Sequence, residues 1–201
     1  MNTPPNNTTP ETGCTAAIAR ALLTDGWTND PDDRAESARG GETRMASPDA
    51  TLSLHASESS DGRCFAVLTA ARVRTEGKRR RSWSAELHAP LSVALAVISA
   101  ARQADASPDP GGIETRLAAA GWHERPEDPE EDLDDDLDDE DGPMVRTWAA
   151  PYGARSVTWY GPDDDPGFWS VDRPRAEGGG VKARLTEHAP ASVVAAVALA
   201  D

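Results

Sequence analysis

A chain of 201 residues, with 38% hydrophobic and 27% charged residues, has the length and composition of one globular domain or two small ones. No apolar run reaches the roughly 20 residues of a membrane span, and the polar start at 1–7 lacks the features of a signal peptide, so we expect a cytoplasmic protein without membrane contact. The net charge of −15 at pH 7 argues against an ordinary nucleic-acid-binding protein, because most of these are basic.

Two helix ends have the same spacing of residues. The first helix, expected at about 16–25, ends at Gly26-Trp27, and a similar segment ends at Gly121-Trp122. Glycine readily adopts positive φ, so each end is predicted to form a Schellman motif that the tryptophan covers. The matched residues, at a constant offset of 95, are Ile18, Leu22, Gly26 and Trp27 with Ile113, Leu117, Gly121 and Trp122.

Strand-like segments follow each of these helix ends. Alternation of apolar and polar residues predicts hairpins in both halves, and in the first half the Ser47-Pro48-Asp49-Ala50 turn joins the two strands. The expected strand segments lie at 43–46, 52–56, from 65, and 83–87 in the first half, and at 145–149, 157–159, from 168, and 181–185 in the second.

A repeated segment that begins His-Ala-Pro lies at the end of each half. It covers 88–97 and returns at 188–197. Proline suits the first helical position because its missing N–H would have no partner there, so Pro90 and Pro190 are predicted to start helices. The apolar residues that follow recur at helical spacing, which predicts a face that packs on a sheet.

The matched elements predict an α+β fold of two tandem α-β4-α repeats, with antiparallel sheets and helices packed on one face. About 60–70 foldable residues per repeat bury little core alone, so we expect the repeats to pack together. The expected organisation is a disordered tail at 1–14, a first repeat at 15–102, a linker at 103–111, and a second repeat at 112–201 that contains an acidic disordered loop at 124–141.

The Ser47-Pro48-Asp49 turn, Trp83 on a later strand and the proline-started final helix resemble an actinobacterial domain of unknown function named for its Ser-Pro-Asp-Tyr motif. The resemblance covers most of both halves. The tyrosine of the motif is replaced by Ala50, and the second half has Ala150-Pro151-Tyr152 without the serine. The resemblance implies a tandem fold unit and a bacterial setting, but no reaction.

Few side chains suggest chemistry. The two His-Ala-Pro segments share one ionisable position, which His88 and His188 occupy. These histidines could bind a metal or act as a general base, or they could pack at the strand ends. Packing is favoured because no third ligand recurs at suitable spacing. Cys14 and Cys64 have neither the number nor the spacing of a disulfide scaffold, so reduced thiols are expected. We predict no catalytic residue, no metal, no cofactor and no enzyme activity.

The charges are very unevenly distributed. Segment 124–141 holds thirteen acidic residues and one arginine, a net charge of −12, and its spacing does not fit a calcium-binding EF-hand loop. It is interpreted as a solvated loop, with weak divalent-ion binding or mimicry of nucleic-acid phosphate as alternatives. Segment 72–83 holds six basic residues and one acidic residue, at a predicted hairpin tip.

Two functions compete on this evidence, ahead of a hydrolase or transferase, which rests only on the general fact that sheet clefts can host sites. The first is a non-catalytic interaction or regulatory protein that binds a protein partner through its tandem repeats. The second is a nucleic-acid-binding regulator that uses the basic tip, which the acidic loop would cover; a solubilising turn is the plainer interpretation of the tip. The candidate partner-binding residues are Arg72, Arg74, Lys78, Arg79, Arg80, Arg81 and Trp83.

Overall fold

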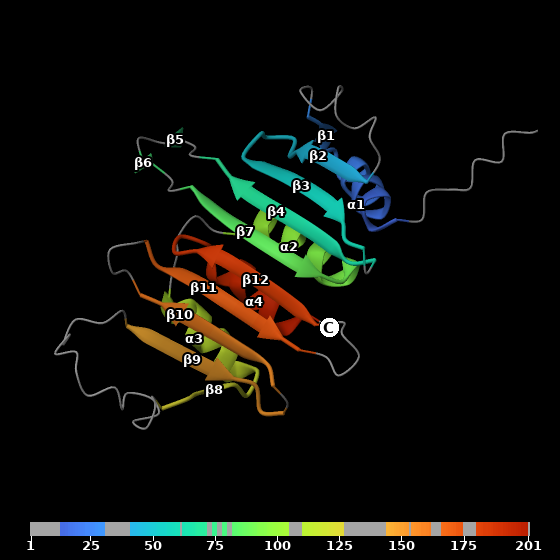
Figure 1. The fold of residues 1–201 in the computed structure, drawn as a ribbon. Helices are drawn as coiled ribbons and strands as arrows, with labels where there is room; N and C mark the ends of the chain where they lie inside the picture. The colour runs from blue at the N-terminus through green and yellow to red at the C-terminus, as the bar shows by residue number, and fades with distance from the viewer. Residues whose placement is uncertain are drawn as a thin grey trace, which may run out of the picture.

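The computed structural model describes most of the chain between residues 13 and 200. The helices of the described residues all cover the same face of one antiparallel sheet, and none of them lies on the opposite face (Figure 1). The described residues are 13–30, 41–60, 62–71, 74–75, 78–79, 82–104, 110–126, 144–152, 154–161, 166–174 and 180–200, with backbone alone for 74–75, 78–79 and 110–111.

Ten strands of the described chain form this sheet, in the order β1-β2-β3-β4-β7-β12-β11-β10-β9-β8. Residues 13–104 provide one half of the order and residues 110–200 the other. The bounds are β1 Thr28–Asn29, β2 Glu42–Ala46, β3 Leu52–Glu58, β4 Cys64–Ala70, β7 Trp83–Ala89, β8 His123–Glu124, β9 Val145–Ala149, β10 Ser156–Tyr160, β11 Phe168–Arg173 and β12 Val181–Thr186.

The predicted fold of two tandem α-β4-α repeats is wrong. The strands belong to one continuous sheet because β7 pairs with β12 in antiparallel register, from Lys182 opposite His88 to Leu185 opposite Ala85. Each half also contributes five strands, since the two-residue strands β1 and β8 form the outer edges. The architecture is a largely β fold with four helices among the described residues: α1 Cys14–Thr24, α2 Leu91–Gln103, α3 Pro110–Ala119 and α4 Ala191–Leu199.

The hydrophobic core lies between the sheet and the helices. Alternate residues of each long strand point toward the helices, and this period of two explains why β7 buries Trp83, Ala85 and Leu87. Helix α2 packs against α1 and α4, and α4 packs against α3, so the helix layer is continuous across the two halves.

Both Gly-Trp helix ends form the predicted Schellman motif. The φ angles of Gly26 and Gly121 are 82° and 81°, and the N–H of Trp27 donates to the carbonyl of Leu22 at 3.0 Å. A proline of the following hairpin packs on each glycine: an added Cβ on Gly26 would lie 3.4 Å from Cγ of Pro48. The glycine therefore supplies both the backbone conformation and the space for this contact.

The proline-started helices are confirmed to within one residue. Pro90 and Pro190 are the N-cap residues of α2 and α4, so each helix begins one position later than predicted. The end of α4 has a partner that the sequence did not reveal. Arg173 of β11 is only 6% exposed, and its guanidinium donates to the carbonyls of Val197, at 3.3 Å, and Ala200, where a cation offsets the negative end of the helix dipole.

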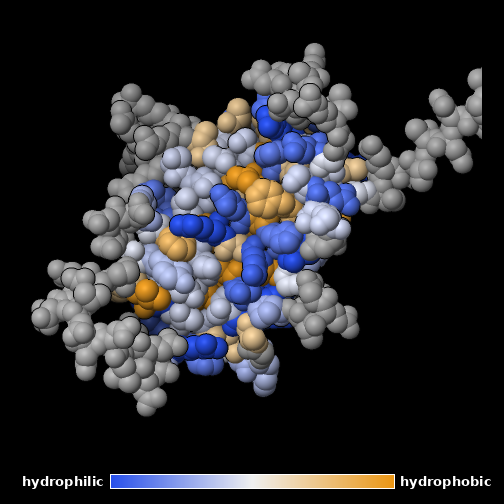
Figure 2. Space-filling model, viewed as in Figure 1, coloured by the Kyte–Doolittle hydropathy of each residue, from blue (hydrophilic) through white to orange (hydrophobic). Residues whose placement is uncertain are grey.

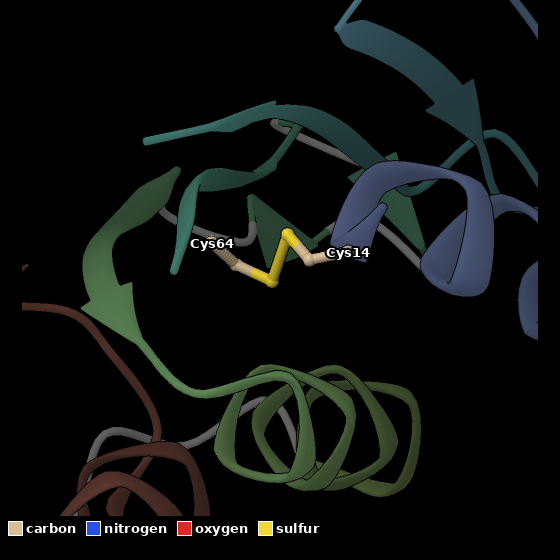
Figure 3. Close-up of a disulfide and its surroundings, with 2 residues drawn as sticks. All are labelled: Cys14 and Cys64. Atoms are coloured by element: carbon tan, nitrogen blue, oxygen red, sulfur yellow. A yellow bond between two sulfur atoms is a disulfide. The ribbon is translucent and has the colours of Figure 1, made fainter. Parts of the chain in front are cut away.

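The cysteines are not the reduced thiols that we expected. Cys14 at the start of α1 and Cys64 at the start of β4 form a disulfide, with their Cα atoms 5.9 Å apart (Figure 3). Spacing along the chain did not predict it because the pair is separated by 50 residues and meets only in the folded sheet. The disulfide ties the N-terminal helix to an inner strand.

Helix α3 is tied to the sheet by charge. Arg146 of β9 donates to Glu114 of α3 at 2.5 Å and to both carboxylate oxygens of Glu124, at 2.7 and 3.0 Å. The hydrogen bond from Arg146 is the main reason that the pKa of Glu124 is lowered, and the same bond raises the pKa of Arg146. The guanidinium also lies 4.9 Å from the centre of the Trp148 ring.

Several predicted segments lie outside the described residues. These are most of the tail (1–12), the loop at 31–40, the centre of the linker (105–109) and most of the acidic segment (127–141). Where the predicted segments extend into the described residues, these residues form helices or strands. Cys14 begins α1, Gln103 ends α2 and Glu124 belongs to β8.

Candidate binding surface on the open face of the sheet

The basic tip forms a separate small hairpin between β4 and β7. Its backbone pairs β5 (Arg74–Thr75) with β6 (Lys78–Arg79) in antiparallel register, with Arg74 opposite Arg79. A hairpin in this place agrees with the sequence prediction. Three of the predicted binding residues, Arg72, Arg80 and Arg81, lie outside the described residues.

Trp83 does not belong to this candidate surface. Its side chain is 8% exposed and forms part of the hydrophobic core on the helix-covered face of β7. The ring therefore has no free face on which a base could stack, and the proposed stacking role is corrected to a core role.

The two histidines occupy different environments. His88 lies on β7, on the open face of the sheet, whereas His188 lies in the turn after β12, with Nδ1 3.9 Å from Oε1 of Glu187. They do not share a position relative to their strands, because β7 ends at Ala89 and β12 already ends at Thr186. Within the described ranges, no group of three or more His, Cys, Asp or Glu side chains is placed to hold a metal ion.

The Ser47-Pro48-Asp49 turn is a hydrogen-bonded structural unit. Ser47 Oγ donates to Asp49 Oδ1 at 2.6 Å and accepts from the N–H of Leu52 at 2.9 Å. The same oxygen of Asp49 accepts from the N–H and the hydroxyl of Thr51, at 3.1 and 2.8 Å. The bond from Ser47 and then those from Thr51 lower the pKa of Asp49, and Ala50 completes the turn at a φ of 53°. These contacts give the motif a role in folding.

The open face combines polar, charged and aromatic side chains. They are the residues that alternate with the buried ones, such as Phe65 on β4, Glu86 on β7 and Arg184 on β12. Figure 2, which has the same view as Figure 1, shows hydrophilic and hydrophobic residues interleaved over the middle of the sheet. The face is therefore neither a bare apolar surface nor a surface of one charge.

A hollow of about 370 Å³ lies near the middle of this face, where the two halves of the chain meet. The hollow is lined by residues of β4 and β7 from the first half and of β11 and β12 from the second half. The residues around it are Phe65, Glu86, Leu87, His88, Ser170, Val171, Asp172, Lys182, Ala183 and Arg184.

Charges of opposite sign alternate around the hollow. The register places Glu86 directly opposite Arg184, and Asp172 directly opposite Lys182. All four residues are exposed. Such an alternating pattern attracts a surface with the complementary pattern and repels one in the wrong register.

An aromatic stack supports Arg184 at one side of the hollow. The guanidinium of Arg184 lies 4.0 Å from the centre of the Phe168 ring, and that ring stacks on Tyr160 with centres 4.5 Å apart and planes 17° apart. On the opposite side of the hollow, Phe65 is 40% exposed. The site thus offers one oriented cation and one accessible aromatic ring.

Comparisons with protein-family models, with curated proteins and with solved structures each find no match to this chain. None of the helices in the described ranges has both the length and the apolar character needed to cross a membrane.

Sequence reasoning missed the residues around the hollow. Their signal is present in the strands, because Phe65, Glu86 and Arg184 occupy the alternate positions between buried residues. Bringing them together requires the pairing of β7 with β12, and this pairing joins segments that are almost one hundred residues apart.

Proposed function

We propose that this is a non-catalytic interaction protein and that the open face of its sheet binds a protein partner. The observation that carries the proposal is the central hollow, which both halves of the chain line with exposed residues of either charge and with Phe65. Protein interfaces commonly combine aromatic and arginine anchors with a polar rim, and Phe65 and Arg184 are side chains of this kind.

The short edges of the sheet favour binding through the face. A partner could otherwise add a strand to an edge and use its free N–H and C=O groups. Among the described residues, the edge strands β1 and β8 have two residues each, and each covers part of a five-residue strand, so either edge offers only short stretches for such pairing. The open face is a wider surface for a folded partner than either edge.

The test is affinity capture from a native cell extract, with and without nuclease, using the wild type and two variants. Phe65→Ser removes the exposed ring from the hollow, and Leu23→Ser removes a similarly exposed apolar residue, 51% exposed, from α1. The proposal expects a stoichiometric protein that resists nuclease, binds Leu23→Ser like the wild type and is lost with Phe65→Ser. Equal retention by all three proteins would contradict it.

The basic hairpin supports a second candidate function, nucleic-acid binding. Its backbone register places the basic residues Arg74 and Arg79 at opposite positions, where like charges are unfavourable without a counter-ion. Nucleic-acid phosphate would supply that counter-ion. Deletion of 127–141, which keeps Glu124 in β8, should then reveal salt-sensitive DNA or RNA binding in a gel-shift assay. If neither the wild type nor the deletion variant binds at about 50 mM salt, this function is contradicted.

The relationship to the actinobacterial Ser-Pro-Asp-Tyr domain and the cytoplasmic location remain proposals. The turn formed by Ser47 and Asp49 supports the first, since its hydrogen bonds give the motif a physical role. The Cys14–Cys64 disulfide weighs against the second, because disulfides persist mainly in oxidising compartments. Fractionation of native cells, with the protein detected by antibody, decides the location.

A further inference from the structure

The positions of Glu86 and Arg184 at the centre of the open face suit a partner related by two-fold symmetry. Glu86 on β7 and Arg184 on β12 are opposite each other across the line where the two halves join. A two-fold axis just above the open face, parallel to these strands and midway between them, would place a second copy face to face with the first. It would put β7 of one copy over β12 of the other.

We propose that the open face binds a second copy of the same chain through this two-fold arrangement. The inference rests on the proposed function and names the partner for the same site. In this dimer the Glu86 side chain of each copy faces Arg184 of the other copy. The four side chains form a square of alternating charges, in which every neighbour across the interface has the opposite sign.

Two other two-fold arrangements of the same faces bring like charges together. An axis directly above β12 and parallel to it would place Arg184 over Arg184 of the second copy. An axis across the strands, between the positions of Lys182 and Arg184, would place these two cations over each other. Like charges in contact oppose association, so the axis between β7 and β12 is favoured over these two. An axis between β11 and β12 would pair Asp172 with Lys182 of the other copy, but it would place β4, which carries Phe65, over β9 and away from the hollow.

The shape of the face agrees with the charges. The same axis places β4 of one copy over β11 of the other, and because Phe65 and Asp172 lie in one row of the register, it brings the exposed Phe65 ring over Asp172 and beside Ser170. Ser170 is small, and a hollow of about 370 Å³ has room for a phenyl ring. Each copy would thus insert one aromatic anchor into the other.

The area of the face is sufficient for a reversible dimer. The six central strands, β3, β4, β7, β12, β11 and β10, have five to seven residues each. With strands about 4.8 Å apart and about 3.3 Å per residue, they span roughly 600 Å² on each copy, or about 1,200 Å² in total, the lower end for a specific interface. Sheets also pack well face to face when their strands are nearly aligned.

The test uses charge reversal in the full chain, measured by analytical ultracentrifugation over a range of concentrations. The wild type should pass from the 21.3 kDa chain to twice that mass as its concentration rises. Glu86→Arg makes all four positions of the square basic, and Arg184→Glu makes all four acidic, so each variant should dimerise at least about tenfold more weakly. The double variant Glu86→Arg, Arg184→Glu restores the alternation and should dimerise again.

A mixture of the two single variants gives the sharpest result. In a mixed dimer, both basic residues of one chain face both acidic residues of the other, so two weakly associating proteins should form a heterodimer. Circular dichroism of each variant alone checks that the sheet is retained. A folded mixture that sediments as the sum of its parts would overturn the proposal, as would a wild type that stays monomeric at every concentration.

The two proposals fail in different ways. A monomeric wild type that still captures a protein through Phe65 would overturn the dimer and leave the proposed binding function intact. A dimer that forms equally in the wild type and in both single variants would place self-association elsewhere on the molecule and also overturn the inference.

Discussion

Ser47 is a small hydroxyl side chain, 6% exposed, whose Oγ links two parts of one turn. It accepts the N–H of Leu52 and donates to Asp49, so its removal would leave a buried N–H without its side-chain acceptor. The Pro48 ring of the same turn packs on Gly26 at the end of α1. The turn therefore connects the first hairpin with the first helix.

Ser47→Ala is expected to lower the free energy of unfolding by about 1–2 kcal/mol, because a buried hydrogen-bonding group loses its partner. Urea denaturation followed by circular dichroism measures the change. Ser53→Ala, on the exposed side of β3, is the matched control and should change stability by less than about 0.5 kcal/mol. Equal effects of both substitutions would show that the turn is not the stabilising unit described.

Asp49 gives the turn a dependence on pH. Its pKa is lowered in the folded protein, chiefly by the bond from Ser47, from an ordinary value of 3.8. A group with a lowered pKa contributes stability above its ordinary pKa and loses that contribution as pH falls further. Asp49→Asn should therefore be less stable than the wild type at about pH 6, with a difference that shrinks below about pH 3.8. Denaturation series at several pH values would contradict this if the difference stayed constant.

Helices α1 and α3 have similar positions over the sheet and are held by different means. The Cys14–Cys64 disulfide secures α1, whereas the ion pair of Arg146 with Glu114 secures α3. A covalent link acts mainly by restricting the unfolded chain, and an exposed ion pair contributes little once water screens it. The stability of the N-terminal half should thus depend on redox conditions, whereas that of the C-terminal half should change little with salt.

Reduction of the disulfide is expected to lower the free energy of unfolding by about 4 kcal/mol, the value that loop entropy assigns to a closed loop of this length. Urea denaturation with and without a phosphine reductant measures the loss. The Cys14→Ser, Cys64→Ser double variant is the control, because its stability should not respond to the reductant. A wild type that is equally insensitive, with two titratable thiols, would show that the disulfide does not form.

Individual elements could be predicted from the sequence because their causes are local. Gly26 with Trp27 marks a helix end through its own φ angle and contacts, and Pro90 marks a helix start through its ring. The two-residue strands β1 and β8 were missed, since two residues carry no periodic pattern. The disulfide was missed because a distance in space does not follow from a spacing along the chain.

At the scale of the whole molecule, the sheet is continuous through the pairing of β7 with β12. The alternation within each strand predicted which residues are buried, but it could not predict which strand lies beside which. The contact of Leu87 with Ala183 depends on the folding of both halves at once. For this reason the hollow and its alternating charges were absent from the predicted site, whereas the basic segment, a local feature, was present.

The open face exists as one surface only if this central pairing holds in solution. In an antiparallel sheet, alternate residues of a strand exchange their hydrogen bonds with the neighbour on one side or on the other. About half of the amides in β7 should therefore be protected by β4 and the other half by β12.

Amide hydrogen exchange, resolved by residue with NMR, tests the continuous sheet most directly. The account predicts slow exchange at every position of β7 that lies opposite β12, from Ala85 to His88, at rates comparable with those inside β4. Fast exchange at alternate positions of β7, together with the matching positions of β12, would show two separate sheets and would contradict the account.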